Sequence, residues 1–347
     1  RPYRPQRVAF SRNGMVSTAQ SQATDAGAEI LSAGGNAFDA AVASAFALGV
    51  CEPQASGLGG QTMVLLHQSE PRTMSARDGS SRAPNRAAPE SLTSIEMRRG
   101  YRATTVPSTP AVLGYLLKTY GPMQLSTVLA PAIRLAEEGF VVTELFRSLA
   151  KRELKNLRRG NASTFFLREG RRTYPVGSSL RQPVLAATLK RLASEGIEDF
   201  YTGEIAERIH ADMEVNGGLL HRDDLARIPW PIERRPVSGR FQGMRIVTFP
   251  PPGAGRVLLE MLNILENFPA KLWNTDSPQG ALLIAQVMRW AAQDRRDRPF
   301  DPNFFPQVEE KKMLDPAYAK GVARKIHRRI KTRGDTTHLS VLDRDGN

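Results

Sequence analysis

The chain has 347 residues, of which 41% are hydrophobic and 24% are charged, so it is long enough for one large globular domain or two ordinary ones. No apolar run approaches the length of a membrane span, and the single cysteine, Cys51, excludes an intrachain disulfide and a cysteine-based metal site. The net charge is +13, but the basic residues are scattered and form no nucleic-acid motif, so we expect a solvated basic surface. On charge alone, a basic protein that binds polyanions remains an open alternative.

The N-terminal part of the chain predicts two helices and a buried strand. Residues 20–33 have apolar side chains at helical spacing, and Gly34-Gly35 ends the run. Asn36 is placed to cap an alanine-rich helix through about Val50. Cys51 lies in an apolar stretch, so we expect it to be buried rather than reactive. The turn Gly57-Leu58-Gly59-Gly60 precedes an apolar strand at 62–67. Because phosphate-binding motifs need the order strand, glycine turn, helix, we predict a tight turn with close backbone approach instead.

The segment from Met74 to Pro89 is polar and is predicted to be rich in turns. It holds two cationic candidates, Arg77 and Arg82. A buried arginine can bind a substrate carboxylate through two parallel hydrogen bonds. The alternative is that both are solvated loop arginines.

Helices and a pair of strands are predicted for the rest of the chain, and no familiar hydrolase motif accompanies them. The predicted helices follow Val106-Pro107 through Tyr120 and then cover 125–139, 143–160, 184–195, 203–215, 255–267 and 278–293, with two short strands within 237–249. Residues 161–183 are expected to be irregular, 221–224 to cap a short helix, and 294–297 to form an ion-paired turn. The absence of His-x-x-x-His and Gly-x-Ser-x-Gly patterns argues against a zinc hydrolase and a serine hydrolase of the elbow type.

One nucleophile candidate lies near the C-terminus, in the stretch from Gly334 to Asp343. Thr336 follows Asp335 where a basic segment leads into a predicted strand and hairpin turn. A threonine hydroxyl becomes a useful nucleophile when its own α-amine, with a pKa of about 8, acts as base. That requires the Asp335–Thr336 peptide bond to be cut first. The alternative is an ordinary strand-edge threonine.

Nine stretches, in order, resemble γ-glutamyltranspeptidases over nearly the whole chain from about Arg12. The Gly-Gly-Asn-Ala-x-Asp-Ala and Thr-Thr-His-x-Ser-Val stretches are the most specific. The stretches are 14–18, 26–31, 34–42, 56–60, 199–203, 216–220, 249–252, 262–266 and 334–341.

The resemblance implies an α+β fold, the αββα sandwich of the N-terminal-nucleophile hydrolases, and a zymogen of glutathione metabolism that cuts itself before Thr336. Residues 1–335 would then be the large subunit, and 336–347 the start of the small subunit. The implied partners are the rest of the small subunit, beyond residue 347, and a small-molecule γ-glutamyl or other amide substrate. No cofactor, metal, nucleic acid or membrane span is implied.

The chain departs from the family at one position that matters for substrate binding. In the family, an arginine in an Arg-Glu-x-Ala-Pro stretch binds the α-carboxylate of the γ-glutamyl group. Alignment on Ala83-Pro84 places Ser80 at the arginine and Ser81 at the glutamate, with Arg77 and Arg82 out of register. A neutral serine cannot replace a bidentate guanidinium, so Ser80, Arg77 and Arg82 are the substrate-binding candidates that need testing.

The sequence therefore predicts an amidohydrolase or acyltransferase in which Thr336 forms an acyl-enzyme that water or an amine resolves. Two alternatives stay open: an acylase or small-amide hydrolase without γ-glutamyl specificity, and an unprocessed, inactive relative. The chain starts Arg1-Pro2 with neither methionine nor a signal region. We expect a periplasmic or secreted protein if a leader was removed, and a cytoplasmic one otherwise.

Overall fold

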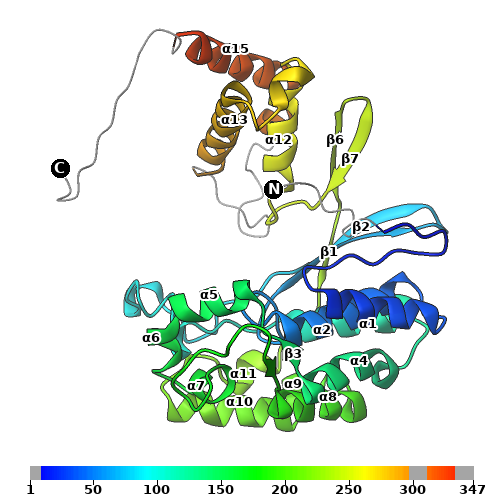
Figure 1. The fold of residues 1–347 in the computed structure, drawn as a ribbon, viewed down its shortest axis with the longest axis vertical. Helices are drawn as coiled ribbons and strands as arrows, with labels where there is room; N and C mark the ends of the chain where they lie inside the picture. The colour runs from blue at the N-terminus through cyan, green and yellow to red at the C-terminus, as the bar shows by residue number, and fades with distance from the viewer. Residues whose placement is uncertain (1–8, 297–310, 333–347) are drawn as a thin grey trace. The chain divides into compact units, whose positions relative to one another are not determined.

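The computed structural model describes residues 9–296 and 311–332, which form two compact units (Figure 1). The first unit consists of Arg1–Thr62 and Gly79–Ile232, and the second of Met63–Asp78 and Glu233–Asn347, within the described ranges. The chain passes between the units at the start of β1 (Thr62–Gln68), the end of β2 (Thr73–Gly79) and the start of β5 (Ile232–Arg234). The predicted strand and turn from Gly334 to Asp343 lie outside the described residues.

The Gly-Gly-Asn-Ala-x-Asp stretch is the start of helix α2 (Ala37–Cys51), as the predicted cap required. The Asn36 side chain accepts hydrogen bonds from the backbone N–H groups of Phe38 and Asp39, at 2.8 and 3.1 Å, and Asp39 accepts one from the Asn36 N–H at 2.8 Å. This reciprocal pattern is a capping box. The Asn36 amide also donates to the Tyr120 carbonyl at 2.7 Å, so the motif ties α2 to the end of α3 (Thr109–Tyr120).

Helices α1 (Ser21–Ser32) and α2 lie side by side because small residues face each other between them (Figure 1). A Cβ atom built on Gly27 would lie 2.3 Å from the Ser44 hydroxyl oxygen, a distance that real Cβ atoms do not show. The glycine turn was also predicted correctly: Gly57 Cα lies 3.3 Å from the position of a Cβ built on Gly49. Cys51 is buried, as expected.

Among its described residues, the remainder of the first unit is mainly helical, with a short antiparallel pair of strands, β3 (Phe140–Val141) and β4 (Ser179–Leu180). Helices α4 and α8 pack on each other, and α2 packs on α4. The helices are α4 (Leu125–Glu138), α5 (Glu144–Arg152), α6 (Leu154–Leu157), α7 (Ala162–Phe166), α8 (Pro183–Glu195), α9 (Asp199–Thr202), α10 (Glu204–Val215) and α11 (Arg222–Leu225). Two single 3-10 turns lie at Pro89–Ser91 and Tyr101–Ala103.

The second unit contains a three-stranded sheet, a hairpin and a group of helices. The sheet has the order β1-β2-β5, and β6 (Val237–Phe241) pairs antiparallel with β7 (Met244–Thr248). Gln242 and Gly243, at the hairpin tip, have φ of 51° and 75°, as a two-residue type I′ turn requires. The helices are α12 (Gly255–Leu265), α13 (Pro278–Arg296), α14 (Lys311–Leu314) and α15 (Pro316–Thr332). Helices α12, α13 and α15 share an apolar core that includes Ile264, Leu283 and Ile326, and Met313 of α14 packs in a second cluster with α12 and α13.

Three sequence predictions of local structure were wrong. Residues 73–79 are a strand rather than a turn-rich loop. The charged side chains of Arg77 and Asp78 are buried because β5 supplies partners, and Arg234 donates to Asp78 at 2.6 Å. The predicted helix over 143–160 divides into α5 and α6, and part of the irregular 161–183 segment forms α7. Asp294 continues α13 and accepts a hydrogen bond from the Tyr318 hydroxyl, so it is not part of a turn.

Candidate active site

The predicted substrate-binding residues all lie at or just beyond the last residues of strand β2. Arg77 is on β2 in the second unit, whereas Ser80 and Arg82 follow the strand in the first unit. Asp335 and Thr336 lie outside the described residues. The geometry that bears on the candidate site is therefore that of residues 79–86, which we call the β2 exit loop.

One hydroxyl and one amide side chain, those of Ser108 and Gln61, hold the start of the β2 exit loop in place. The Ser108 hydroxyl donates to the Gly79 carbonyl, and the Ser81 N–H donates to the Gln61 side-chain oxygen at 3.0 Å. Ser108 itself donates its backbone N–H to the Gly60 carbonyl at 3.0 Å. The glycine turn and the start of α3 therefore hold Ser80 between two anchored neighbours.

Gly79 has no room for a side chain. A Cβ built there would lie 2.2 Å from a methyl carbon of Val112 and 2.5 Å from the Thr62 carbonyl oxygen. The β2 exit loop thus passes directly over α3, and glycine is required at this point for lack of space.

Ser80 and Arg82 differ in solvent exposure. Ser80 is half-buried. Arg82 is exposed, its backbone pairs with Val106, and its guanidinium donates to the Arg227 carbonyl. The Arg82 side chain is thereby held against the segment that follows α11.

Arg77 is buried and is held within the second unit. Its side chain is 5% exposed, its Nη1 lies 3.4 Å from a carboxylate oxygen of Glu233, and it donates to the Ala76 carbonyl at 3.2 Å. A protein carboxylate on β5 therefore already faces this guanidinium. That Arg77 binds substrate stays a prediction.

The end of the β2 exit loop contacts two carboxylates that the sequence had suggested only as a helix cap. Asp224 accepts the Asn85 N–H at 2.6 Å, and Asp223 accepts from Arg86 Nη1 at 2.7 Å. The Arg86 guanidinium, followed by the Asn85 amide, lowers the pKa of the Asp223 carboxyl below its ordinary value. Sequence reasoning missed these contacts because 137 to 139 positions separate the partners.

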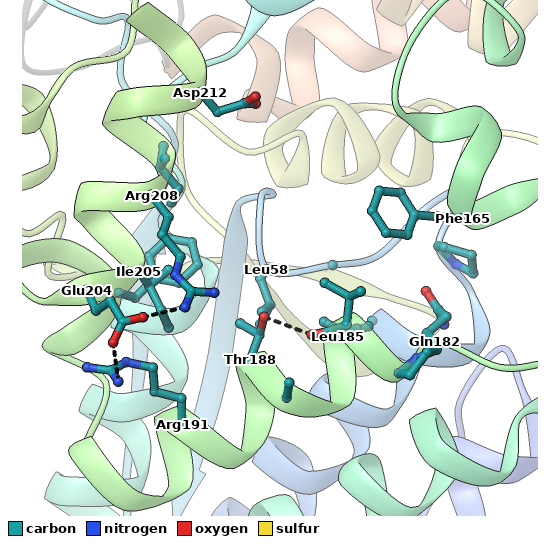
Figure 2. Close-up of a pocket in the computed structure, with 18 of the residues that line it drawn as sticks. Leu58, Phe165, Gln182, Leu185, Thr188, Arg191, Glu204, Ile205, Arg208 and Asp212 are labelled. Atoms are coloured by element: carbon teal, nitrogen blue, oxygen red, sulfur yellow. Dashed lines mark hydrogen bonds and ion pairs between the residues drawn. The ribbon is translucent and has the colours of Figure 1, made fainter. Parts of the chain in front are cut away.

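A separate cavity of about 1000 Å³ lies in the first unit between α7, α8 and α10. Figure 2 shows Glu204 between Arg191 and Arg208 on one side of it and Phe165 on the other. Arg191 lies 2.6 Å from Glu204, and Arg208 pairs with the same carboxylate. Because these charges compensate one another, the cavity offers an incoming molecule a mainly apolar wall.

Neither a metal centre nor a membrane helix is found in the described parts of the chain. Among residues 9–296 and 311–332, no three histidine, cysteine or acidic side chains are grouped so that they could hold a metal ion. Within the same ranges, every helix is too short or too polar to cross a bilayer.

Comparison with known proteins relates nearly the whole chain to one family. Residues 23–347 match the family described as Gamma-glutamyltranspeptidase. The chain is 34% identical to the glutathione hydrolase proenzyme of Escherichia coli (strain K12) over 97% of its own length and 62% of that protein. It is also 34% identical to the acylase ACY 1 proenzyme of Pseudomonas sp. (strain SE83), over 98% of this chain and 64% of that one.

Solved structures give the same relation. The Helicobacter pylori gamma-glutamyltranspeptidase superposes with a TM-score of 0.84 at 31% identity, covering 92% of this chain and 93% of that one. By contrast, the chain spans less than two thirds of the length of the two curated relatives named above.

Proposed function

Because this chain belongs to the gamma-glutamyltranspeptidase family and has its N-terminal-nucleophile hydrolase fold, we propose that it is the larger part of an amide-cleaving hydrolase or acyltransferase. Its precursor cuts itself between Asp335 and Thr336. Residues 1–335 then form the large subunit, and the small subunit begins at Thr336. The partner of the large subunit is this small subunit, made of residues 336–347 and the remainder of the same precursor.

Self-cleavage produces the catalytic group. The Thr336 hydroxyl attacks the Asp335 carbonyl, the peptide C–N bond breaks, and the nitrogen of Thr336 becomes a free amine as an ester forms. Water then hydrolyses the ester, which releases the Asp335 carboxylate and restores the hydroxyl. The free α-amine, with a pKa of about 8, sits next to the hydroxyl that it must deprotonate.

The same two groups then cleave the substrate amide. The amine accepts the hydroxyl proton as the Thr336 oxygen attacks the substrate carbonyl, and the proton passes to the departing amine. The acyl group stays on Thr336 as an ester. Water resolves the ester in hydrolysis, and an amine acceptor resolves it in transfer.

The observation that supports this function most strongly is the Gly334-Asp335-Thr336-Thr337-His338 stretch, within a family match that extends to residue 347. Two relatives, a glutathione hydrolase and an acylase, are both named as proenzymes. A proenzyme is what self-cleavage before Thr336 would require.

Two candidate functions differ in the acyl group that the enzyme would accept. A γ-glutamyl group carries an α-carboxylate, for which a guanidinium is the natural partner. Ser80, which stands at the aligned arginine position, offers a single neutral hydroxyl. The nearby Arg82 already donates to the Arg227 carbonyl. These features favour a second candidate, an acylase for acyl groups without an α-carboxylate; a third alternative is an unprocessed, inactive chain.

The test uses the full-length, self-processed enzyme with two p-nitroanilides, one γ-glutamyl and one butyryl, the second lacking the charged groups. We expect Ser80→Arg to raise kcat/KM for the γ-glutamyl substrate by about 10- to 100-fold, since a charge-assisted hydrogen bond contributes about 1.5–3 kcal/mol. The butyryl substrate and the matched control Ser81→Arg should change little. Efficient γ-glutamyl turnover by wild type, with no gain in Ser80→Arg, would refute the role of Ser80. Absence of turnover of any amide would refute the enzymatic function.

A further inference from the structure

A single buried carboxylate fixes the far end of the β2 exit loop. Asp224, the third residue of α11, is 3% exposed. It accepts the Asn85 N–H at 2.6 Å and the His221 N–H at 2.9 Å. Arg86 Nη1 lies 3.7 Å from its second oxygen. The backbone of the loop is thus bonded directly to a carboxylate that solvent does not screen.

Its neighbour Asp223 makes contacts of a different kind. The β2 exit loop reaches Asp223 through side chains, since the carboxylate accepts from Arg86 at 2.7 Å and from the Asn85 amide at 3.2 Å. Its side chain is 52% exposed. Exposed ion pairs contribute little because water and salt screen them. Asp223 and Asp224 can therefore be compared as neighbouring carboxylates of the same helix. Asp223 is exposed and contacts loop side chains, whereas Asp224 is buried and contacts the loop backbone.

The α11 segment holds the middle of the β2 exit loop as well as its end. The Arg82 guanidinium donates to the carbonyl of Arg227, two residues beyond the end of α11. Asn85 is bound by Asp224 within α11. A displacement of this short helix would therefore move the Arg82 side chain and the loop backbone together.

The other end of the β2 exit loop is fixed independently, by Ser108 on Gly79 and by Gln61 on Ser81. The Arg82 carbonyl also accepts the Val106 N–H at 2.9 Å. The two ends of the loop are thus bound by different elements of the first unit. When the α11 end is released, Gly79 and Ser81 stay anchored, and the added conformational freedom is confined to the Arg82 side chain and to residues 83–86.

From this geometry, we propose that Asp224 is a positioning residue, which sets the placement of the Arg82 side chain and of the loop residues up to Arg86, and thereby influences which acyl group of a substrate is bound. The proposal rests on the proposed function, in which the β2 exit loop, with Ser80 at the aligned arginine position, lies beside the acyl group. Asp224 itself does not touch the substrate in this account. It acts through the Asn85 backbone and through the segment that carries the Arg227 carbonyl.

The test compares Asp224→Asn with Asp223→Asn in the full-length, self-processed protein, using the better of the two p-nitroanilides. An asparagine at 224 keeps one carbonyl oxygen for a backbone N–H but loses the charge and the second acceptor. We expect Asp224→Asn to raise KM about 10-fold with kcat within about twofold of wild type. Asp223→Asn should leave both constants within about twofold. These sizes assume that loop placement affects acyl-group binding more than the chemical step.

A second measurement does not depend on activity. Amide hydrogen exchange across residues 79–86, in the uncleaved Thr336→Ala protein, should accelerate in Asp224→Asn and not in Asp223→Asn, while exchange in α2 stays unchanged. The proposal is overturned if KM and loop exchange are unaffected. It is also overturned if both carboxylate variants behave alike, or if kcat, KM and the thermal midpoint all deteriorate together. A wild type without amide turnover would count against the proposed function, and the exchange result would still decide whether Asp224 holds the loop.

Discussion

The hydroxyl of Tyr201 links α9 to the start of α3, and its removal should destabilise the first unit. Tyr201 is fully buried. Its hydroxyl donates to the Pro107 carbonyl at 3.0 Å and accepts the Ala111 N–H at 3.1 Å. Burial raises the pKa of Tyr201, so the hydroxyl keeps the proton it donates. The two backbone groups flank Ser108, which holds the β2 exit loop.

Tyr201→Phe keeps the ring and leaves both backbone groups without this partner. Each buried group left unsatisfied costs about 1–3 kcal/mol, so we expect a loss of about 2–4 kcal/mol in the free energy of unfolding. For a unit of this size, that corresponds to a fall of roughly 5–15 °C in the thermal midpoint. Because Ser108 loses its support, exchange at the β2 exit loop should also accelerate.

The assay is thermal and urea unfolding followed by circular dichroism, with Tyr101→Phe as the control. The Tyr101 hydroxyl accepts an exposed hydrogen bond from the Asn161 amide at 3.2 Å, and its removal should cost less than about 1 kcal/mol. If Tyr201→Phe is as stable as Tyr101→Phe, the buried hydroxyl does not support α3, and the reasoning fails.

Two further predictions concern the same unit. Gly79→Ala should lower the free energy of unfolding by about 1–3 kcal/mol through overpacking, since the new Cβ would lie 2.2 Å from a Val112 methyl carbon. The control Gly59→Ala, whose Cβ would have no atom within 4 Å, should leave the free energy of urea unfolding nearly unchanged. Equal effects of the two substitutions would contradict this. Asp199 accepts two hydrogen bonds from Arg191 at 2.8 Å, which lower the pKa of the Asp199 carboxyl. Its stabilising effect is present above the unfolded pKa of about 3.9 and is lost as the pH falls through the lower folded pKa. Asp199→Asn should therefore destabilise the protein clearly at pH 7 and progressively less below about pH 4; an equal loss at pH 7 and pH 3 would contradict the ion pair.

Local chemistry allowed much of the fold to be predicted from sequence. Asn36 and Asp39 are three residues apart, so the cap they form is visible in the sequence. Strand β2 was missed because its charged residues resemble a loop. Asp78 is buried only because Arg234, 156 positions away, pairs with it. A sequence pattern read over a window of a few residues cannot reveal such a partner.

In the candidate site too, some residues could be predicted from the sequence and others could not. Ser80 was identified because its stretch aligns with a family motif. Thr336 was identified because the Gly334-to-Val341 stretch matches another family motif and because a threonine can use its own α-amine as a base. The hydrogen bond from Asn85 to Asp224 was not predicted, because capping the short helix α11 already accounted for an aspartate at this position. The loop it holds comes from a segment 139 residues earlier, and only the folded arrangement brings the two together.

Every catalytic step proposed here depends on self-cleavage before Thr336, which intact-mass spectrometry of the full-length gene product can detect. The wild type is predicted to give two fragments that meet between Asp335 and Thr336. Thr337→Ala, a change at the neighbouring threonine, should split at the same bond, and Thr336→Ala should remain whole. A wild type that stays uncleaved under native conditions would contradict the account, because Thr336 would then have no free amine to act as its base.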